Sequence, residues 1–320
     1  MVIVKRLFRF VFVMVTLTGV LAGSLALAAP QVGKLVSAHR SDHERISLKP
    51  LAERSLIYDR AGNLQGTLTN RNDPQNREQV PLAKVPKTVK LAVLASEDAN
   101  FYDHKGVNVR SILRAVDANL ASGEVSQGGS TLTQQAVKNS LVGDEQDFSR
   151  KLREAFLAVE LEKQMTKDQI LERYLNSVYF GGGAYGVQAA SQYFFDKDVS
   201  TLNWAEGALL AGLIPSPAAY DPFKFPAAAT KRRRLVLRRL VETDQLSAEE
   251  ARLYGLVPLP KTPHRPPPPY DYFLEEVKQQ LLLDPRFNLG ATEAARSRTL
   301  YEGGIRVYTT FDPAMQLMAE

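Results

Sequence analysis

The pattern of apolar and polar positions begins with a long apolar run near the N-terminus. Residues 10–29 form a 20-residue stretch without a charged side chain, and they follow Lys5, Arg6 and Arg9. A helix of this length just spans a bilayer, and the preceding cations predict a cytoplasmic N-terminus with the rest exported. The alternative is a cleaved signal peptide, because residues 26–28 fit a cleavage site, although the run is long for one.

Beyond this run, the pattern changes from β-prone to helical. Residues 55–68 contain two β-prone stretches around a turn at residues 61–63, which predicts a short hairpin. From about residue 86 the apolar positions follow the helical period instead. Helices are expected over residues 87–98, 107–120, 148–164, 167–180, 184–195, 205–214, 231–241, 247–253 and 271–283.

Specific residues mark several boundaries of these elements. Thr166 with Gln169, and Asn203 with Glu206, have the spacing of capping boxes at helix starts. A strand is expected over residues 304–310, and another helix starts close to the last residue.

Changes in composition divide the chain into four expected parts. A Pro-rich stretch at residues 263–269 separates the helical body from the C-terminal segment. The parts are a cytoplasmic tip with anchor or signal peptide (1–30), a membrane-proximal segment with the hairpin (31–80), a helical domain (81–255), and a linker segment (256–320).

Composition narrows the classes of function only a little. The 320 residues are 44% hydrophobic and 23% charged, which is typical of a globular protein with a sizeable core. The net charge of +5 suits anionic partners such as lipid headgroups, phosphates or nucleic acid, without choosing among them. The absence of cysteine excludes a thiol nucleophile, a thiolate zinc site and disulfides, and the four scattered histidines do not suggest a metal site.

The first candidate for chemistry is a pair of acids at the end of an apolar helix. Glu97 and Asp98 follow this helix and precede Phe101, His104 and Gly106. Acids that emerge from apolar surroundings are candidates for general acid–base catalysis. Composition alone favours the other interpretation, a helix C-terminus with solvated acids.

The second candidate is a glycine turn that leads into polar side chains. After Gly129 come Ser130, Thr131, Gln134, Gln135, Lys138 and Asn139. Hydroxyls, amides and a cation in this arrangement suit phosphate and sugar hydroxyl groups. The segment lacks the spacing of a Walker loop and of a nucleophile elbow. A polar loop that caps a helix explains the pattern equally well.

The third candidate lies within a helix and combines Arg150, Lys151 and Glu154. An Arg150–Glu154 ion pair on the surface is one interpretation. Against it, Glu154 shares its stripe with Ala158 and Leu161, and a carboxylate on an apolar stripe is either paired or functional. The basic run at residues 231–239 is interpreted first as a solvated helix face, and second as a membrane contact.

In this order, the segments closely resemble the glycosyltransferase domain (family 51) of class A penicillin-binding proteins, which monofunctional peptidoglycan glycosyltransferases share. The resemblance extends over residues 54–240. It implies a mostly α, lysozyme-like domain with a small membrane-proximal jaw lobe, preceded by one transmembrane helix. The segments that carry it are EDANFYDHKG, GGSTLTQQAVKN, RKLREAFLAVELE, ILERYLNSVYFGGGAYGVQAAS, NWAEGALLAGLIPSPAAYDPF and RRRLVLRRL.

The resemblance also implies a reaction and a set of roles. Lipid II is polymerised into β-1,4 glycan strands with inversion at the anomeric carbon, and undecaprenyl pyrophosphate is released. Glu97 matches the catalytic base, and Glu154 matches the second acid, which assists the leaving pyrophosphate. The residues matched to substrate and pyrophosphate binding are Lys138, Arg150, Lys151, Ser130, Thr131, Gln134, Gln135 and Asn139. The residues matched to building the site are Asp98, Phe101 and His104.

Cofactors, partners and location are implied in the same way. No cofactor is required, and the one metal option is Mg²⁺ or Mn²⁺ at Glu154. The expected partners are lipid II, the growing glycan strand, membrane lipid and proteins of cell-wall synthesis complexes, but no nucleic acid. The expected location is the cytoplasmic membrane, with a single pass and the catalytic domain on the extracytoplasmic face.

Two further features bear on this assignment. Residues 270–277 and 304–313 resemble the linker toward a transpeptidase domain, yet neither S-x-x-K nor K-T-G occurs, so the sequence predicts no cross-linking and no penicillin binding.

The nearest alternative is a lytic transglycosylase or lysozyme-type murein hydrolase. The cations Lys138, Arg150 and Lys151 argue against it, because a hydrolase has no pyrophosphate to stabilise. The other alternative is a non-catalytic cell-wall scaffold.

Overall fold

The computed structural model describes residues 46, 48, 50–68, 76–108, 129–141, 148–265 and 272–319. The expected membrane span at residues 10–29 and most of the helix expected over 107–120 lie outside these ranges. The elements below belong to the unit Leu48–Glu320. In the described ranges the unit is mostly helical, as the sequence predicts, and none of its helices has the length and apolarity needed to cross a bilayer.

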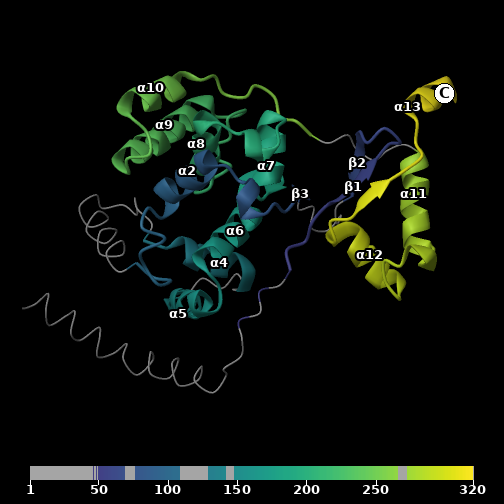
Figure 1. The fold of residues 1–320 in the computed structure, drawn as a ribbon, viewed down its shortest axis with the longest axis horizontal. Coiled ribbons are helices and arrows are strands. Elements are labelled where there is room, and N and C mark those ends of the chain that lie inside the picture. The colour runs from purple at the N-terminus through teal and green to yellow at the C-terminus, as the bar shows by residue number, and fades with distance from the viewer. Residues whose placement is uncertain are drawn as a thin grey trace, which may run out of the picture. The chain divides into compact units, whose positions relative to one another are not determined.

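One group of helices packs around the almost entirely apolar helix α8 (Trp204–Leu213). Figure 1 shows these helices packed together. Gly207 makes close packing possible, because a Cβ atom there would lie 2.7 Å from the Thr88 carbonyl oxygen. The helices are α2 (Lys87–Glu97), α8 (Trp204–Leu213), α9 (Pro226–Glu242) and α10 (Ala248–Leu256).

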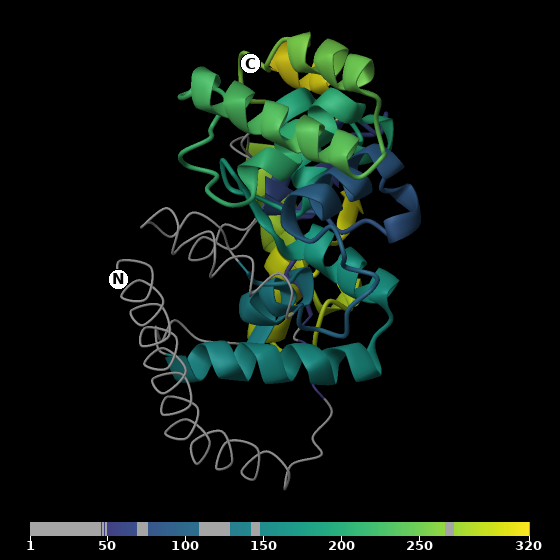
Figure 2. The same cartoon turned by 90° about the vertical axis from the view of Figure 1, so that its left-hand side faces the viewer.

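A second group of helices lies next in the chain. In it α4 contacts both α5 and α6, and α5 is seen side-on in Figure 2. The capping box of Thr166 and Gln169 begins α6 as predicted, and that of Asn203 and Glu206 begins α8. The members are α4 (Leu132–Leu141), α5 (Phe148–Gln164), α6 (Lys167–Ser177) and α7 (Val187–Phe195).

The helix expected over residues 167–180 is too long in the prediction, and the one expected over 184–195 begins too early. Residues Tyr179–Gly181 form strand β4 and Ala184–Tyr185 form β5, which also pairs with β3 (Asn76–Arg77). The cause is the glycine run, since residues 181–183 all have positive φ and cannot continue a helix. Gly186, also at positive φ, then starts α7.

Two other helices differ from their predicted bounds, one at its start and one at its end. The basic helix begins at Pro226 instead of residue 231, since proline is well suited to the first helical turn. A capping box of Ser247 and Glu250 begins α10 close to the predicted start, but the helix continues to Leu256 instead of ending at residue 253.

A small sheet completes the described unit. The predicted hairpin is confirmed, with β1 (Ser55–Tyr58) antiparallel to β2 (Leu64–Leu68). Strand β6 (Arg306–Tyr308) lies parallel to β1, so the hairpin and the C-terminal segment share one sheet of order β2-β1-β6. Its apolar cluster includes residues of α11 (Tyr272–Leu283) and of α12 (Glu293–Glu302), a helix that the sequence analysis missed. The remaining helices are the short η1 (Leu82–Lys84), η2 (Val199–Thr201) and η3 (Pro285–Phe287), and α13 (Pro313–Ala319).

Candidate active site

Glu97 is the last residue of α2 and lies partly buried against α4 and α9. Burial raises the pKa of its carboxyl group above the ordinary value. Four contacts act in the opposite direction: a hydrogen bond from Gln135 Nε2 at 3.0 Å, the charges of Arg232 and Arg239, and the Ser96 hydroxyl at 3.3 Å. The carboxylate is therefore partly shielded from water and held by defined partners, as suits a general base.

The amide of Gln135 has a defined orientation because Tyr174 determines it. The Tyr174 hydroxyl donates to Gln135 Oε1 at 3.0 Å, which leaves Nε2 to donate to Glu97. Tyr174 is fully buried, and burial together with the charges of Glu97 and Asp98 raises its pKa well above the ordinary value. The phenol thus stays protonated and can only donate to the amide oxygen. Sequence analysis predicted a helix over this position but did not single out Tyr174.

Asp98 anchors the loop after α2 to the start of α4. It is 7% exposed, so the interpretation of two solvated acids is wrong. Its Oδ2 accepts a hydrogen bond from the Leu132 backbone N–H at 3.0 Å and lies 2.8 Å from His104 Nε2. The buried ring of Phe101 packs edge-on against His104. The structure therefore brings together Asp98, Phe101 and His104, the three residues expected to build the site.

Glu162 and Lys167 extend this network, and sequence analysis had not singled them out. Glu162 Oε1 accepts a hydrogen bond from the Thr133 hydroxyl at 2.5 Å, and it lies 2.8 Å from the Lys167 ammonium and 4.0 Å from His104 Nδ1. The same ammonium lies 4.4 Å from the centre of the Phe101 ring. These contacts tie α4, α5 and α6 to the loop after α2.

Thr131 and Gln134 form the capping box that starts α4. The Gln134 backbone N–H donates to the Thr131 hydroxyl at 3.2 Å, and the Thr131 N–H donates to Gln134 Oε1 at 2.9 Å. The Thr131 hydroxyl in turn donates to the Gly106 carbonyl oxygen at 2.6 Å. Both side chains are buried, so the helix-capping interpretation of this segment is confirmed.

Glu154 lies on α5 and is only 1% exposed. Glu154 is therefore not on the surface, while its pairing with Arg150 is untested because that side chain lies outside the described part. The apolar stripe that Glu154 shares with Ala158 and Leu161 is buried as expected. The Lys151 ammonium lies 2.8 Å from Glu154 Oε2 and donates to the Ser130 hydroxyl at 2.7 Å. A half-exposed cation is thus held over the start of α4 by a buried carboxylate.

Three other residues were expected to bind substrate, and the structure describes the side chains of two of them. Lys138 and Asn139 are exposed on α4. Arg150 belongs to α5, but its side chain lies outside the described part. Within the described ranges, no group of three or more histidine, aspartate or glutamate side chains is arranged to hold a metal ion.

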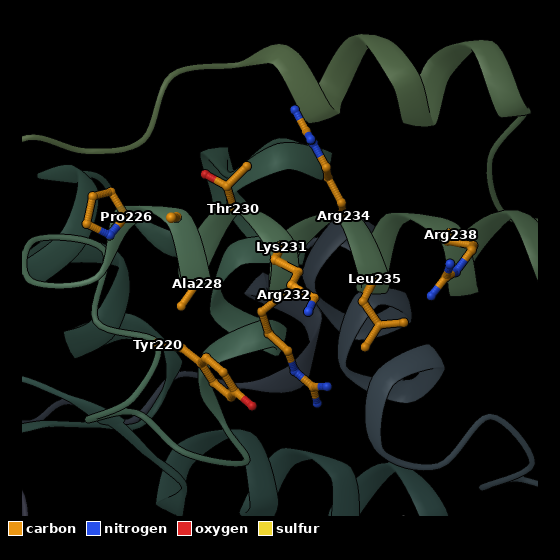
Figure 3. Close-up of a pocket in the computed structure, with 10 residues that line it drawn as sticks. Tyr220, Pro226, Ala228, Thr230, Lys231, Arg232, Arg234, Leu235 and Arg238 are labelled. Carbon is orange, nitrogen blue, oxygen red and sulfur yellow. The ribbon is translucent and has the colours of Figure 1, made fainter. Parts of the chain in front are cut away.

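The sequence first suggested that the basic residues of α9 form a solvated helix face, but in the structure not all of them are exposed. Arg233 is 3% exposed and donates to the carbonyl oxygens of Gly255 and Val257. Arg232 leans over the Tyr220 ring, as Figure 3 shows. The helical spacing of residues 232, 236 and 239 places Arg232 and Arg239 on the same stripe as Val236, but it does not show which groups the two arginines contact. An open groove of about 950 Å³ runs along the helix, lined by Tyr220, Pro226, Ala227, Ala228, Thr230, Lys231, Arg232, Arg234, Leu235 and Arg238.

Comparison with known proteins decides the family. The family model described as transglycosylase matches residues 63–241, more than half of the chain. The chain belongs to the transglycosylase family. The expectation of a peptidoglycan glycosyltransferase domain like that of class A penicillin-binding proteins is thereby confirmed.

Curated relatives of this transglycosylase are longer proteins. It is 39% identical over 266 residues to penicillin-binding protein 1A of Aquifex aeolicus, covering 83% of this chain and 35% of that one. It is 32% identical over 314 residues to penicillin-binding protein 4 of Bacillus subtilis, covering 92% of this chain and 50% of that one. The chain thus spans between about a third and a half of these relatives.

Among solved structures, the transglycosylase is similar to penicillin-binding protein 1A from Haemophilus influenzae. The identity is 23%, the TM-score is 0.44, and the match covers 85% of this chain and 29% of that one. At this score the likeness adds nothing to the family assignment.

In this transglycosylase, α4 is the element that joins the candidate residues. Gln135 on α4 contacts Glu97, the N–H of Leu132 contacts Asp98, and Ser130 before the helix contacts Lys151. The base candidate and the buried acid of α5 are therefore linked through one short helix.

Proposed function

We propose that this domain polymerises lipid II into β-1,4 glycan strands, with inversion at the anomeric carbon and release of undecaprenyl pyrophosphate. The observation that carries the proposal is Glu97, a partly buried carboxylate with a raised pKa that is held by an oriented amide. The family shows a transglycosylase domain, and we propose that its finer architecture is lysozyme-like with a jaw lobe. A single transmembrane helix at residues 10–29 would hold the site at the extracytoplasmic surface of the membrane, where the lipid substrate lies.

In the proposed reaction, Glu97 accepts the proton of the acceptor's sugar 4-hydroxyl group. The hydroxyl oxygen then forms a bond to the anomeric carbon of the growing strand. The bond from that carbon to the pyrophosphate oxygen breaks, and its electron pair leaves with the undecaprenyl pyrophosphate. Attack opposite to the leaving group converts the α linkage into a β linkage.

The environment of Glu97 suits this role because two effects balance. Burial makes the carboxylate a stronger base than an exposed glutamate, since it raises the pKa toward the working pH. The hydrogen bond from Gln135 and the charges of Arg232 and Arg239 keep the ionised form accessible. A carboxylate that is already ionised can accept the proton at the start of the reaction.

The leaving pyrophosphate requires positive charge on the other side of the reacting centre. We propose that Lys151, Lys138 and Arg150 supply it, with Ser130 and Asn139 as hydrogen-bonding neighbours. The buried carboxylate of Glu154 holds the Lys151 ammonium in place at 2.8 Å. Cations that are fixed before the reaction stabilise charge as it develops.

The described residues around Glu154 do not fit a divalent cation. Beside a substrate's phosphate oxygens, Mg²⁺ or Mn²⁺ needs only one or two carboxylates, so the deciding point is which group already contacts Glu154. Glu154 Oε2 also lies 2.8 Å from the Lys151 ammonium. We therefore assign the leaving-group role to the protein's own cations.

The site also bears on the two alternatives, a murein hydrolase and a non-catalytic scaffold. A murein hydrolase would use Glu97 as an acid and would have no need for the cations near α4 and α5. A scaffold would need neither the buried Glu154 nor the oriented Gln135. The arrangement of these groups favours synthesis over both. The wider partners that we propose are lipid II, the growing strand, membrane lipids and other proteins of cell-wall synthesis.

Polymerisation of lipid II by the detergent-solubilised protein tests the proposal. We expect glycan product from the wild type and a loss of about 10²- to 10⁴-fold in Glu97→Gln, the usual range for a general base. Glu242→Gln is the matched control, because Glu242 also ends a helix but is 62% exposed. Fragments released from murein, with no polymer from lipid II, would support the hydrolase instead.

A further inference from the structure

Arg239 of α9 contacts the last turn of α2, where Glu97 lies, and Arg232 of the same helix contacts the end of α8. Arg239 Nη1 donates to the Ser96 carbonyl oxygen at 2.5 Å, one residue before Glu97. Arg232 Nε donates to the Gly212 carbonyl oxygen at 3.3 Å, and its guanidinium lies 5.5 Å from the centre of the Tyr220 ring. Both side chains are half-buried. Their positions are therefore fixed by contacts with backbone and ring, independently of any contact with the carboxylate.

This position matters because Glu97 is in an unfavourable place for an ionised carboxylate. It ends α2, and the C-terminal end of a helix carries partial negative charge. Burial adds to the difficulty. Among the described residues, the charged or titratable groups that interact with its carboxyl group are Tyr174 of α6, and Arg232 and Arg239 of α9. Of these, only the two arginines carry the charge that favours ionisation.

We infer that Arg239, supported by Arg232, is a positioning residue that anchors the end of α2 and keeps Glu97 ionised for catalysis. The inference rests on the proposed role of Glu97 as the base. Arg239 satisfies a carbonyl oxygen in the last turn of α2, so it also closes that helix end against α9. Arg239 thus fixes the backbone at the end of α2, and its positive charge favours the ionised form of Glu97.

The other arginines of α9 do not share this arrangement. Arg233 is buried and donates to the carbonyl oxygens of Gly255 and Val257, which holds the C-terminal end of α10 against α9. Arg238 faces solvent, with 67% of its side chain exposed. The run of basic residues in the sequence therefore contains side chains with different tasks, and Arg238 provides a charge-matched control for Arg239.

The test is the pH dependence of kcat/KM for lipid II polymerisation in Arg239→Gln and Arg238→Gln. A base must lose its proton, so activity rises as pH rises through its pKa. Removing a nearby positive charge moves this acid limb to higher pH in Arg239→Gln, so the rate on the acid side of the limb falls severalfold relative to wild type. Arg238→Gln keeps the wild-type profile, and Arg239→Lys, which keeps the charge, restores the position of the limb. An unmoved limb in Arg239→Gln overturns the inference.

A second readout does not depend on activity. The carboxyl carbon of Glu97 in ¹³C-labelled protein is assigned by its loss in Glu97→Gln, and its chemical shift is followed against pH. We expect a higher midpoint in Arg239→Gln than in the wild type, and no change in Arg238→Gln. If wild type makes no glycan but this midpoint still moves, the proposed function fails while the coupling stands. If Arg239→Gln does not fold, Arg232→Gln removes the other positive charge that acts on Glu97 and is expected to raise the midpoint, and an unchanged value there overturns the inference.

Discussion

At Glu97, burial and ionisation act against each other within one carboxyl group. Burial raises its pKa in the folded protein, whereas in the unfolded chain the group has its ordinary value. Below the ordinary pKa both states are protonated, and the folded state carries no electrostatic cost. As pH rises through the folded pKa, the ionised group must stay partly buried, so the free energy of unfolding falls. The residue that we propose as the base therefore destabilises the fold at neutral pH.

This cost predicts that Glu97→Gln changes stability in a pH-dependent way. The neutral amide keeps the size of the side chain without the buried charge, so the mutant should gain stability relative to wild type as pH rises from about 4 to about 8. Thermal unfolding of both detergent-solubilised proteins over this range measures the difference. In the exposed control, Glu242→Gln, the difference should stay nearly constant. A Glu97→Gln difference that does not vary with pH would mean that the carboxyl group is not shifted.

At the same scale, sequence analysis finds residues whose type is unusual for their local surroundings. It does not find residues whose role depends on a contact with a residue far away in the chain. Glu97 and Glu154 are singled out because acids beside apolar residues are unusual. Arg239 is not, because its hydrogen bond to Ser96 joins positions 143 residues apart. No local pattern contains that contact. Tyr174 escaped for a similar reason, since a tyrosine in an apolar helix resembles ordinary core until Gln135 is beside it.

At the scale of elements, one glycine determines how closely the loop after α2 approaches α5. Gly106 has φ +83°, and a Cβ atom there would lie 2.7 Å from the backbone of Ala158. Gly62 in the hairpin turn has nearly the same φ, +84°, but a Cβ atom there would meet nothing within 4 Å. Comparison of Gly62 with Gly106 therefore separates the energetic cost of a positive φ from the cost of a steric clash between the added Cβ atom and α5.

We therefore expect different outcomes for alanine at these two positions. Gly62→Ala should cost about 1 kcal/mol of stability, from backbone strain alone. Gly106→Ala should cost more than about 3 kcal/mol, because backbone atoms of α5 cannot move aside easily. It should also reduce activity, since the Gly106 carbonyl accepts the Thr131 hydroxyl that starts α4. Chemical denaturation of both variants checks this, and equal losses would exclude the collision.

Helix existence is easier to predict at this scale than helix ends. Capping boxes at Thr166 and Asn203 have a fixed local spacing, and both are present. The end of α6 was misplaced because three consecutive glycines form a strand turn whose partner, β3, lies about a hundred residues earlier. α12 has few apolar residues and only one that is buried, Leu300, so its periodicity is weak.

At the scale of the whole described unit, the first and last elements depend on each other. Strand β6 pairs with β1, and Ile57 and Leu68 of the hairpin pack in one cluster with Leu274, Leu281 and Leu300. The sequence predicts the hairpin and the last strand separately, but not their pairing, because about 250 residues separate the two partners. A two-stranded hairpin alone is marginally stable in water. The C-terminal segment therefore supplies most of the cover that orders the hairpin.

A chain that ends at Arg265 tests this dependence. It lacks α11, α12 and β6, so we expect amide hydrogen exchange across residues 55–68 to accelerate by about 100-fold or more, since local opening would then cost little free energy. Exchange in α8 and α9 should stay slow, because their contacts with α2 lie within the retained part. Mass spectrometry of peptides from both proteins measures the two regions in one experiment.

Removal of residues 313–320 alone is the matched control for this truncation. In α13 the side chains of Met315, Leu317 and Met318 are exposed, so its loss should leave exchange in the hairpin unchanged. If the hairpin stayed protected in the longer truncation, we would attribute this to the contacts of residues 52–54 with residues 76–79 and α7, among which Arg54 makes the most side-chain hydrogen bonds. This buried arginine hydrogen-bonds to Asn76 and to Gln192 of α7. Exchange would then rise only when Arg54→Ala is added, which would assign the ordering of the hairpin to the transglycosylase domain itself.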